Sequence, residues 1–181
     1  WIAAGMGFGT HPHDNMEIIT IPTSGTVEHK DSMGNHGTIT AGEIQVMSAG
    51  TGIRHSEFNP SPQDPVHLLQ IWIVPDRLRV EPRYQQVHFP DSEKRGRLRL
   101  IISPEGSDGS LSVYQDARVY AGLFDGDEGA TLDLGISRHA YVHLARGSLQ
   151  INGQRLAAGD GARLRDETAI EITAGDVAEV L

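Results

Sequence analysis

The sequence predicts an all-β protein built from two similar small antiparallel β-barrels. Short runs of β-forming residues, bounded by turn residues, recur along most of the 181-residue chain, which is typical of barrels and sandwiches. A sustained 3.6-residue periodicity, which would indicate amphipathic helices, is absent. The predicted strands cover residues 26–30, 37–40, 44–47, 67–74, 98–102, 139–144 and 149–152.

A weak internal repeat indicates that the two halves share one plan. In the first half, Gly25 is followed by a strand, a turn and a strand that reaches residues 41–43 (Ala-Gly-Glu). In the second half, Gly147 is followed by the same succession, which ends at residues 158–160 (Ala-Gly-Asp). Asn152-Gly153 predicts a type I′ turn within it, because both residues tolerate positive φ.

We therefore expect a first barrel at residues 1–75, a connection rich in charge and proline at 76–97, and a second barrel at 98–181. The chain opens at Trp1 without an initiator methionine, and its last residues are typical of the middle of a strand. We expect that outer strands are missing at one or both ends.

Composition narrows the functional classes. The net charge of −9 and the lack of basic runs argue against direct nucleic-acid binding. No apolar run approaches the roughly 18 residues of a membrane span, and no basic-then-apolar leader opens the chain, so we expect a cytoplasmic protein without membrane contact. With no cysteine and nine histidines, a transition-metal site must use imidazole, carboxylate or water ligands.

Two pairs of polar residues have the spacing of metal ligands. His11 and His13 are two residues apart, as are His55 and Glu57, so on strands each pair points to one face. Two such pairs in one small barrel can converge on one ion. Glu17 falls on the same predicted face as His11 and His13, and competes with Glu57 as the carboxylate.

Other polar residues are open to plainer interpretations. His29 and His36 flank a hairpin and are interpreted as solvated. His67 is either a core residue or a pocket wall, and Gln70 either satisfies a backbone group or faces the cavity. His139 and His143 are placed on the outward side of a strand whose alternate residues face the core.

The spacing around the first pair also matches a known family pattern. Gly5, His11-x-His13, Glu17 and Gly25 fit the first cupin motif, in which Glu17 would be a ligand. The second cupin motif is matched by Gly52, His55 and Asn59. Within the cupins, His-Pro-His at 11–13 together with Gly-Ile-Arg-His-Ser-Glu at 52–57 resembles pirins, and so does Glu-Pro-Arg-Tyr-Gln at 81–85.

The resemblance implies a bicupin with one divalent metal bound by His11, His13, His55 and Glu57, and it moves Glu17 to a position that orients a histidine. Iron(II) is the preferred metal, with nickel, manganese, zinc and copper as alternatives. Bacterial pirin-like proteins resemble quercetin 2,3-dioxygenases, which open a flavonol ring with O₂ and release carbon monoxide. A flavonol-like substrate is therefore implied, with Glu57 as the catalytic residue that accepts a hydroxyl proton.

The resemblance leaves a second functional class open. Eukaryotic pirin is regarded as a redox-sensitive metal-bearing regulator that binds a protein partner, in which case dioxygenase turnover is a side activity.

The second half of the chain departs from the pattern, because the positions equivalent to the ligands are Asp133, Gly135 and Ile172. We expect the second barrel to be structural and free of metal.

Overall fold

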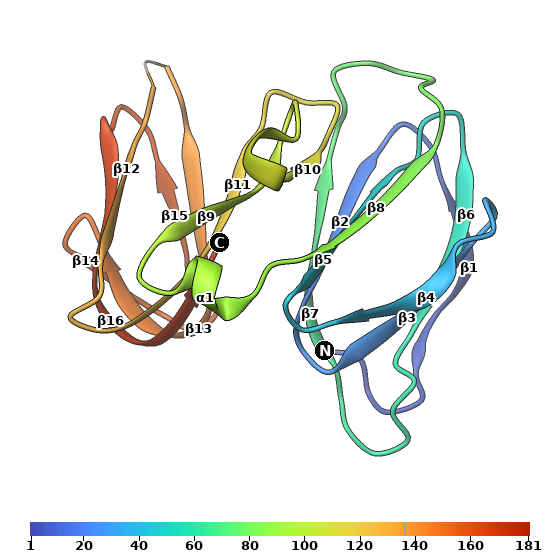
Figure 1. The fold of residues 1–181 in the computed structure, drawn as a ribbon, viewed down its shortest axis with the longest axis horizontal. Coiled ribbons are helices and arrows are strands. Elements are labelled where there is room, and N and C mark those ends of the chain that lie inside the picture. Colours follow the sequence, from blue (N-terminus) through green and yellow to red (C-terminus); the bar gives the residue numbers. More distant parts are fainter. Residues whose placement is uncertain (136) are drawn as a thin grey trace. The chain divides into compact units, whose positions relative to one another are not determined.

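The computed structural model describes residues 1–135 and 137–181, and nearly all its regular elements are strands, which confirms the all-β prediction (Figure 1). The chain divides into two units. Unit 1 comprises Trp1–Phe89 and Ile101–Arg118, and unit 2 comprises Pro90–Leu100 and Val119–Leu181. Across the described residues, neither the length nor the apolarity of any helix suffices for a membrane span.

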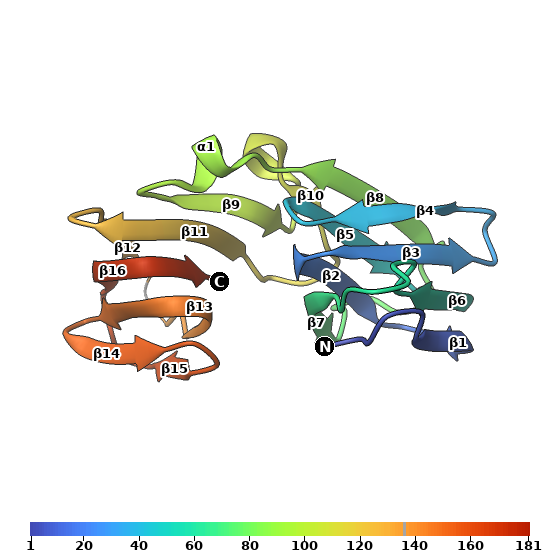
Figure 2. The same ribbon diagram turned by 90° about the horizontal axis from the view of Figure 1, so that it is seen from below.

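Unit 1 contains two four-stranded antiparallel sheets that stack face to face (Figure 2). The first sheet has the order β1 (Gly7–His13), β6 (Ile53–Phe58), β3 (Thr26–Asp31), β4 (His36–Thr40). The second has the order β7 (His67–Ile73), β2 (Glu17–Ser24), β5 (Glu43–Ser48), β8 (Arg83–His88). Ile18 and Met47 of the second sheet pack with Ile53 of the first in one buried cluster.

The sheets of unit 1 form an open sandwich, which corrects the expectation of a closed barrel. Each sheet keeps two end strands, and among the described strands no pairing joins one sheet to the other. The predicted strands 26–30, 37–40, 44–47 and 67–74 correspond to β3, β4, β5 and β7 to within one residue at each end. The segment 76–97 contains β8, which pairs with β5, and the short helix α1 (Asp91–Lys94).

Unit 2 is held by an apolar core. Its strands are β11 (Val119–Gly126), β12 (Ala130–Asp133), β13 (Ala140–Ile151), β14 (Gln154–Ala157), β15 (Gly161–Leu164) and β16 (Ala169–Val180). Strands β11, β16, β13 and β14 are neighbours in that order, while β12 pairs with β16 and β15 with β13. The two predicted strands 139–144 and 149–152 are one strand, β13, whose Val142 and Leu144 face the core as expected.

The segment Ile101–Arg118 of unit 1 is less regular. It contains the end of β9 (Leu98–Ser103), the 3₁₀ turn η1 (Ser107–Gly109) and the two-residue strand β10 (Leu111–Ser112). Strand β10 pairs in parallel with the end of β9.

One turn occurs in both units and supports the predicted repeat. Gly42 has a φ of 90° and Gly159 a φ of 91°, a left-handed conformation that glycine adopts without strain. In each turn the next residue, Glu43 or Asp160, accepts a hydrogen bond of 2.8 Å from the backbone N–H three residues earlier. Asn152-Gly153 has positive φ at both residues, as the type I′ prediction requires.

Strands β1 and β6 approach so closely that Gly7 has no room for a side chain. A Cβ at Gly7 would lie 2.6 Å from Phe58 Cα and closer still to the carbonyl oxygen of Glu57. We predict that Gly7→Ala lowers the free energy of unfolding by about 1–3 kcal/mol, because the backbone of β6 must move. Gly9→Ala is the matched control, since a Cβ there meets nothing within 4 Å. Chemical denaturation measures both, and equal stabilities would contradict the prediction.

Candidate metal centre

The pairing of β1 with β6 brings three histidines together. His11 lies opposite His55, and His13 lies on the same face of β1, where both are partly buried while Pro12 between them is exposed. The ring centroids are 4.4 Å apart for His11 and His55, 5.0 Å for His13 and His55, and 4.8 Å for His11 and His13. One ligand atom from each lies within 4.8 Å of the others.

Glu57 lies on the same inward face of β6 as His55 and is only 2% exposed. Its two carboxylate oxygens accept hydrogen bonds from the opposite sheet: Thr20 Oγ1 donates to Oε1 at 3.1 Å, and Gln70 Nε2 donates to Oε2 at 2.7 Å. Glu57 also forms a cluster with His55 and His29, in which one ligand atom of each residue lies within 4.8 Å of the others.

The donor atoms fit a divalent metal. Neither ring nitrogen of the buried His55 has a hydrogen-bond partner among the described residues, which is costly for a buried polar group. Desolvation, followed by the neighbouring His11, His29 and His13, lowers the pKa of His55 to about 3 and keeps the ring neutral. His11 Nδ1 donates to the Gly9 carbonyl at 2.8 Å, which leaves Nε2 with a lone pair, as in metal-binding histidines.

Glu17 does not share the face of His11 and His13, and the structure corrects that expectation. Strand β1 ends at His13, a turn with Asn15 at φ 45° follows, and Glu17 begins β2 in the opposite sheet. Ser48 Oγ donates to Glu17 Oε2 at 2.8 Å. Burial raises the pKa of Glu17, and the Ser48 hydrogen bond opposes that shift. Within the described residues, Glu17 belongs to no cluster that could bind a metal.

His29 is buried, which corrects the expectation that it is solvated. Strand β3 turns Val27, His29 and Asp31 inward, while Glu28 between them is only partly buried. The apolar Val27 two residues before His29 is the signal in the sequence that indicates this inward face. His36 is exposed, as expected, and its Nε2 lies 2.8 Å from Glu28 Oε1.

Two residues of β7 extend the site toward the surface. Gln70 faces Glu57, which settles its alternatives in favour of the cavity. Trp72 donates from Nε1 to Gln70 Oε1 at 3.2 Å, and its ring lies edge-on to His13 at 5.0 Å while 55% of the residue is exposed. His67 is partly buried and contacts Thr23.

An open pocket of about 440 Å³ lies beside His13. It is lined by residues 12–14 and 51–54 together with Ser32. This volume is in the range of small-molecule sites, and His13 belongs to both the pocket wall and the histidine cluster.

Comparison with known proteins identifies related chains. The pirin family model matches residues 2–73, and the model described as the quercetinase C-terminal cupin domain matches residues 100–181. Quercetin 2,3-dioxygenase of Escherichia coli (strain K12) is 46% identical over 180 residues, which cover 99% of this chain and 77% of that protein. A pirin-like protein of Caulobacter vibrioides is 40% identical and covers 99% and 78%.

Solved structures agree with these matches. The crystal structure of the bacterial pirin YhhW from Escherichia coli in complex with nickel(II) superposes with a TM-score of 0.92 at 46% identity, covering 99% of this chain and 76% of that one. YhaK from the same organism has a TM-score of 0.86 at 29% identity, with coverage of 99% and 79%. Because the matches span both units at high identity, this chain belongs to the pirin family and has its bicupin fold.

Proposed function

We propose that this chain is a metal-dependent dioxygenase of the quercetin 2,3-dioxygenase type, whose metal is held by His11, His13, His55 and Glu57. The observation that carries the proposal is the convergence of His11, His13 and His55, together with the two buried ring nitrogens of His55, which have no partner among the described residues. The relatives named quercetin 2,3-dioxygenase support a flavonol-like substrate and O₂.

Iron(II) is the metal that we propose. Imidazole and carboxylate donors suit first-row divalent ions, and sets of this kind with open positions are used by non-heme iron(II) oxygenases. The nickel(II) bound to the related pirin makes nickel the first alternative, before manganese, zinc and copper. When bound, such an ion polarises substrate oxygens as a Lewis acid and brings substrate and O₂ together.

The protein groups around the site hold the ligands and shape the entrance. The two hydrogen bonds from Thr20 and Gln70 keep Glu57 aimed from β6 into the sandwich, which supports a fixed ligand. Glu57 remains our candidate for accepting the hydroxyl proton of the substrate, and that role requires one of these hydrogen bonds to open. The exposed indole of Trp72 lies beside His13, where an aromatic ligand would approach.

The reaction is tested directly with the iron(II)-loaded protein and quercetin. We expect O₂ consumption and carbon monoxide release in equal amounts, because both atoms of O₂ enter the ring-opened product while one ring carbon leaves as carbon monoxide. Protein loaded with nickel(II), manganese(II), zinc(II) or copper(II) is measured in parallel. Turnover no faster than that of free iron(II) at the same concentration would refute the proposed reaction.

Removing a histidine tests the metal site independently of the reaction. Removal of a residue that only orients a metal ligand weakens metal binding by roughly 10- to 100-fold. We predict that His11→Ala, which removes a ligand itself, weakens iron(II) binding by more than that. Titration calorimetry under anaerobic conditions measures the affinity, and circular dichroism confirms the fold. His36→Ala, at an exposed histidine on β4, serves as the control. Equal affinities of the two variants would argue against His11 as a ligand.

The hydrogen bond from Thr20 tests how Glu57 is held. Thr20→Val keeps the shape of the side chain but leaves the buried Glu57 Oε1 without its donor, which costs about 1–3 kcal/mol of unfolding free energy. We also expect metal affinity to fall by about 10- to 100-fold. Thr131→Val, an exposed position on β12, is the matched control. Unchanged stability and affinity would show that Thr20 does not position the carboxylate.

A further inference from the structure

His29 has no part in the proposed ligand set, yet it is 0% exposed beside that set. It lies directly opposite Glu57 across the pairing of β3 with β6, as His11 lies opposite His55 across the pairing of β1 with β6. Ligand atoms of His29, His55 and Glu57 lie within 4.8 Å of one another, and none of these residues is more than 2% exposed.

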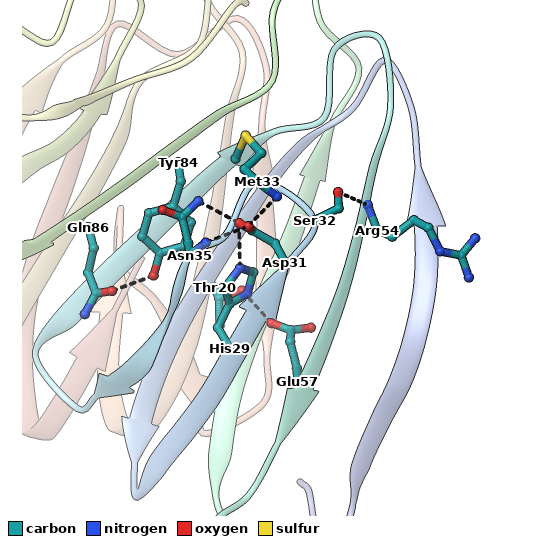
Figure 3. A network of polar contacts seen from close by, with 10 residues as sticks. All are labelled: Thr20, His29, Asp31, Ser32, Met33, Asn35, Arg54, Glu57, Tyr84 and Gln86. Atoms are coloured by element: carbon teal, nitrogen blue, oxygen red, sulfur yellow. Dashed lines mark hydrogen bonds and ion pairs between the residues drawn. The ribbon is translucent and has the colours of Figure 1, made fainter.

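Asp31 holds the His29 ring in one orientation (Figure 3). His29 Nε2 lies 3.2 Å from Asp31 Oδ2. The same carboxylate accepts hydrogen bonds from the backbone N–H groups of Met33 and Asn35 and from Asn35 Nδ2, at 2.8–3.0 Å. Burial alone would raise the pKa of Asp31, but the hydrogen bonds from Asn35, His29 and Met33 hold it below its usual value. Because a carboxylate with these three N–H donors is an acceptor, His29 Nε2 donates to it.

This arrangement leaves a lone pair on His29 Nδ1. That atom is buried and has no hydrogen-bond partner in the described part of the chain. Metal-binding histidines characteristically donate their other ring N–H to a carboxylate, which fixes the tautomer and the ring orientation. His29 and Asp31 have that relationship, and Figure 3 shows the His29 ring between Asp31 and Glu57.

We propose that His29 is a metal-binding residue, and that His29, His55 and Glu57 form an inner divalent-metal position. The outer position is that of the proposed ligand set, His11, His13, His55 and Glu57, whose three histidines form the other cluster. Because the two positions share His55 and Glu57, one ion occupies one of them at a time. The inner set has the two imidazoles and one carboxylate typical of non-heme iron(II) oxygenases.

The neighbouring phenol does not complicate this assignment. The Tyr84 ring lies 5.1 Å from that of His29, and its hydroxyl donates to Gln86 at 2.6 Å. Burial, together with Asp31, Glu43 and Glu57, raises the pKa of Tyr84 to about 12. Tyr84 therefore stays protonated at neutral pH and contributes no anionic ligand.

The inner position is isolated by removing the outer histidines. In the full chain, the double variant His11→Ala/His13→Ala keeps His29, His55 and Glu57. We expect it to bind one cobalt(II) ion per chain, more weakly than the unmodified protein does. Titration calorimetry and the cobalt absorption spectrum measure this binding. Adding His29→Asn is expected to abolish this binding, whereas adding His36→Asn, the same substitution at an exposed histidine, leaves it unchanged.

A second variant tests the orienting carboxylate. Asp31→Asn added to the double variant is expected to weaken cobalt(II) binding by about 10- to 100-fold. Circular dichroism and thermal unfolding establish that each variant is folded before binding is compared.

Two results would overturn the inner position: a folded double variant that binds no cobalt(II), or His29→Asn and His36→Asn triple variants that bind it equally. The proposal rests on the metal-binding part of the proposed function but not on its reaction. No step of the test measures quercetin turnover, so the inner position can be confirmed or refuted even if the protein does not catalyse the proposed reaction.

Discussion

The register between β1 and β6 is the constraint on which the site depends. It sets His11 opposite His55, and the two-residue alternation of each strand then places His13 and Glu57 on the same inward side. A slip of one residue would turn the ligands of the displaced strand toward solvent, because successive side chains point to opposite faces of a sheet. Gly7 maintains this contact, since any larger residue would push β6 away at Glu57 itself.

Local spacing predicted much of this arrangement, and its errors have identifiable causes. The pairs at 11 and 13 and at 55 and 57 follow from strand periodicity alone, and the short strands and the Ala-Gly-acid turn were recognised from local residues. The prediction for Glu17 is wrong because it extends the two-residue alternation of the strand past His13. A turn in which Asn15 adopts positive φ breaks that alternation. His29 was missed because burial of a histidine depends on the strand beside it, here β6, which is distant in sequence. Strand β8 escaped recognition because its side chains are largely polar.

The two units show how one plan can hold different interiors. In unit 2 the core is an apolar cluster around Phe124, Leu144 and Ile172. In unit 1 the interior also contains His29, His55 and Glu57, whose desolvation must be offset by hydrogen bonds or a bound ion. A shared backbone plan therefore does not predict shared chemistry, and the side chains on the inward face of each strand decide what a unit can bind.

The hydrogen bonds that Thr20 and Gln70 make to Glu57 cross the interior of the sandwich. The carboxylate belongs to one sheet, and its hydrogen-bond donors belong to the other. An ion bound by that carboxylate therefore stabilises both sheets, and its binding free energy adds to that of folding. Metal binding and stability against unfolding are therefore linked, and removal of the ion would destabilise the same two sheets that form the site.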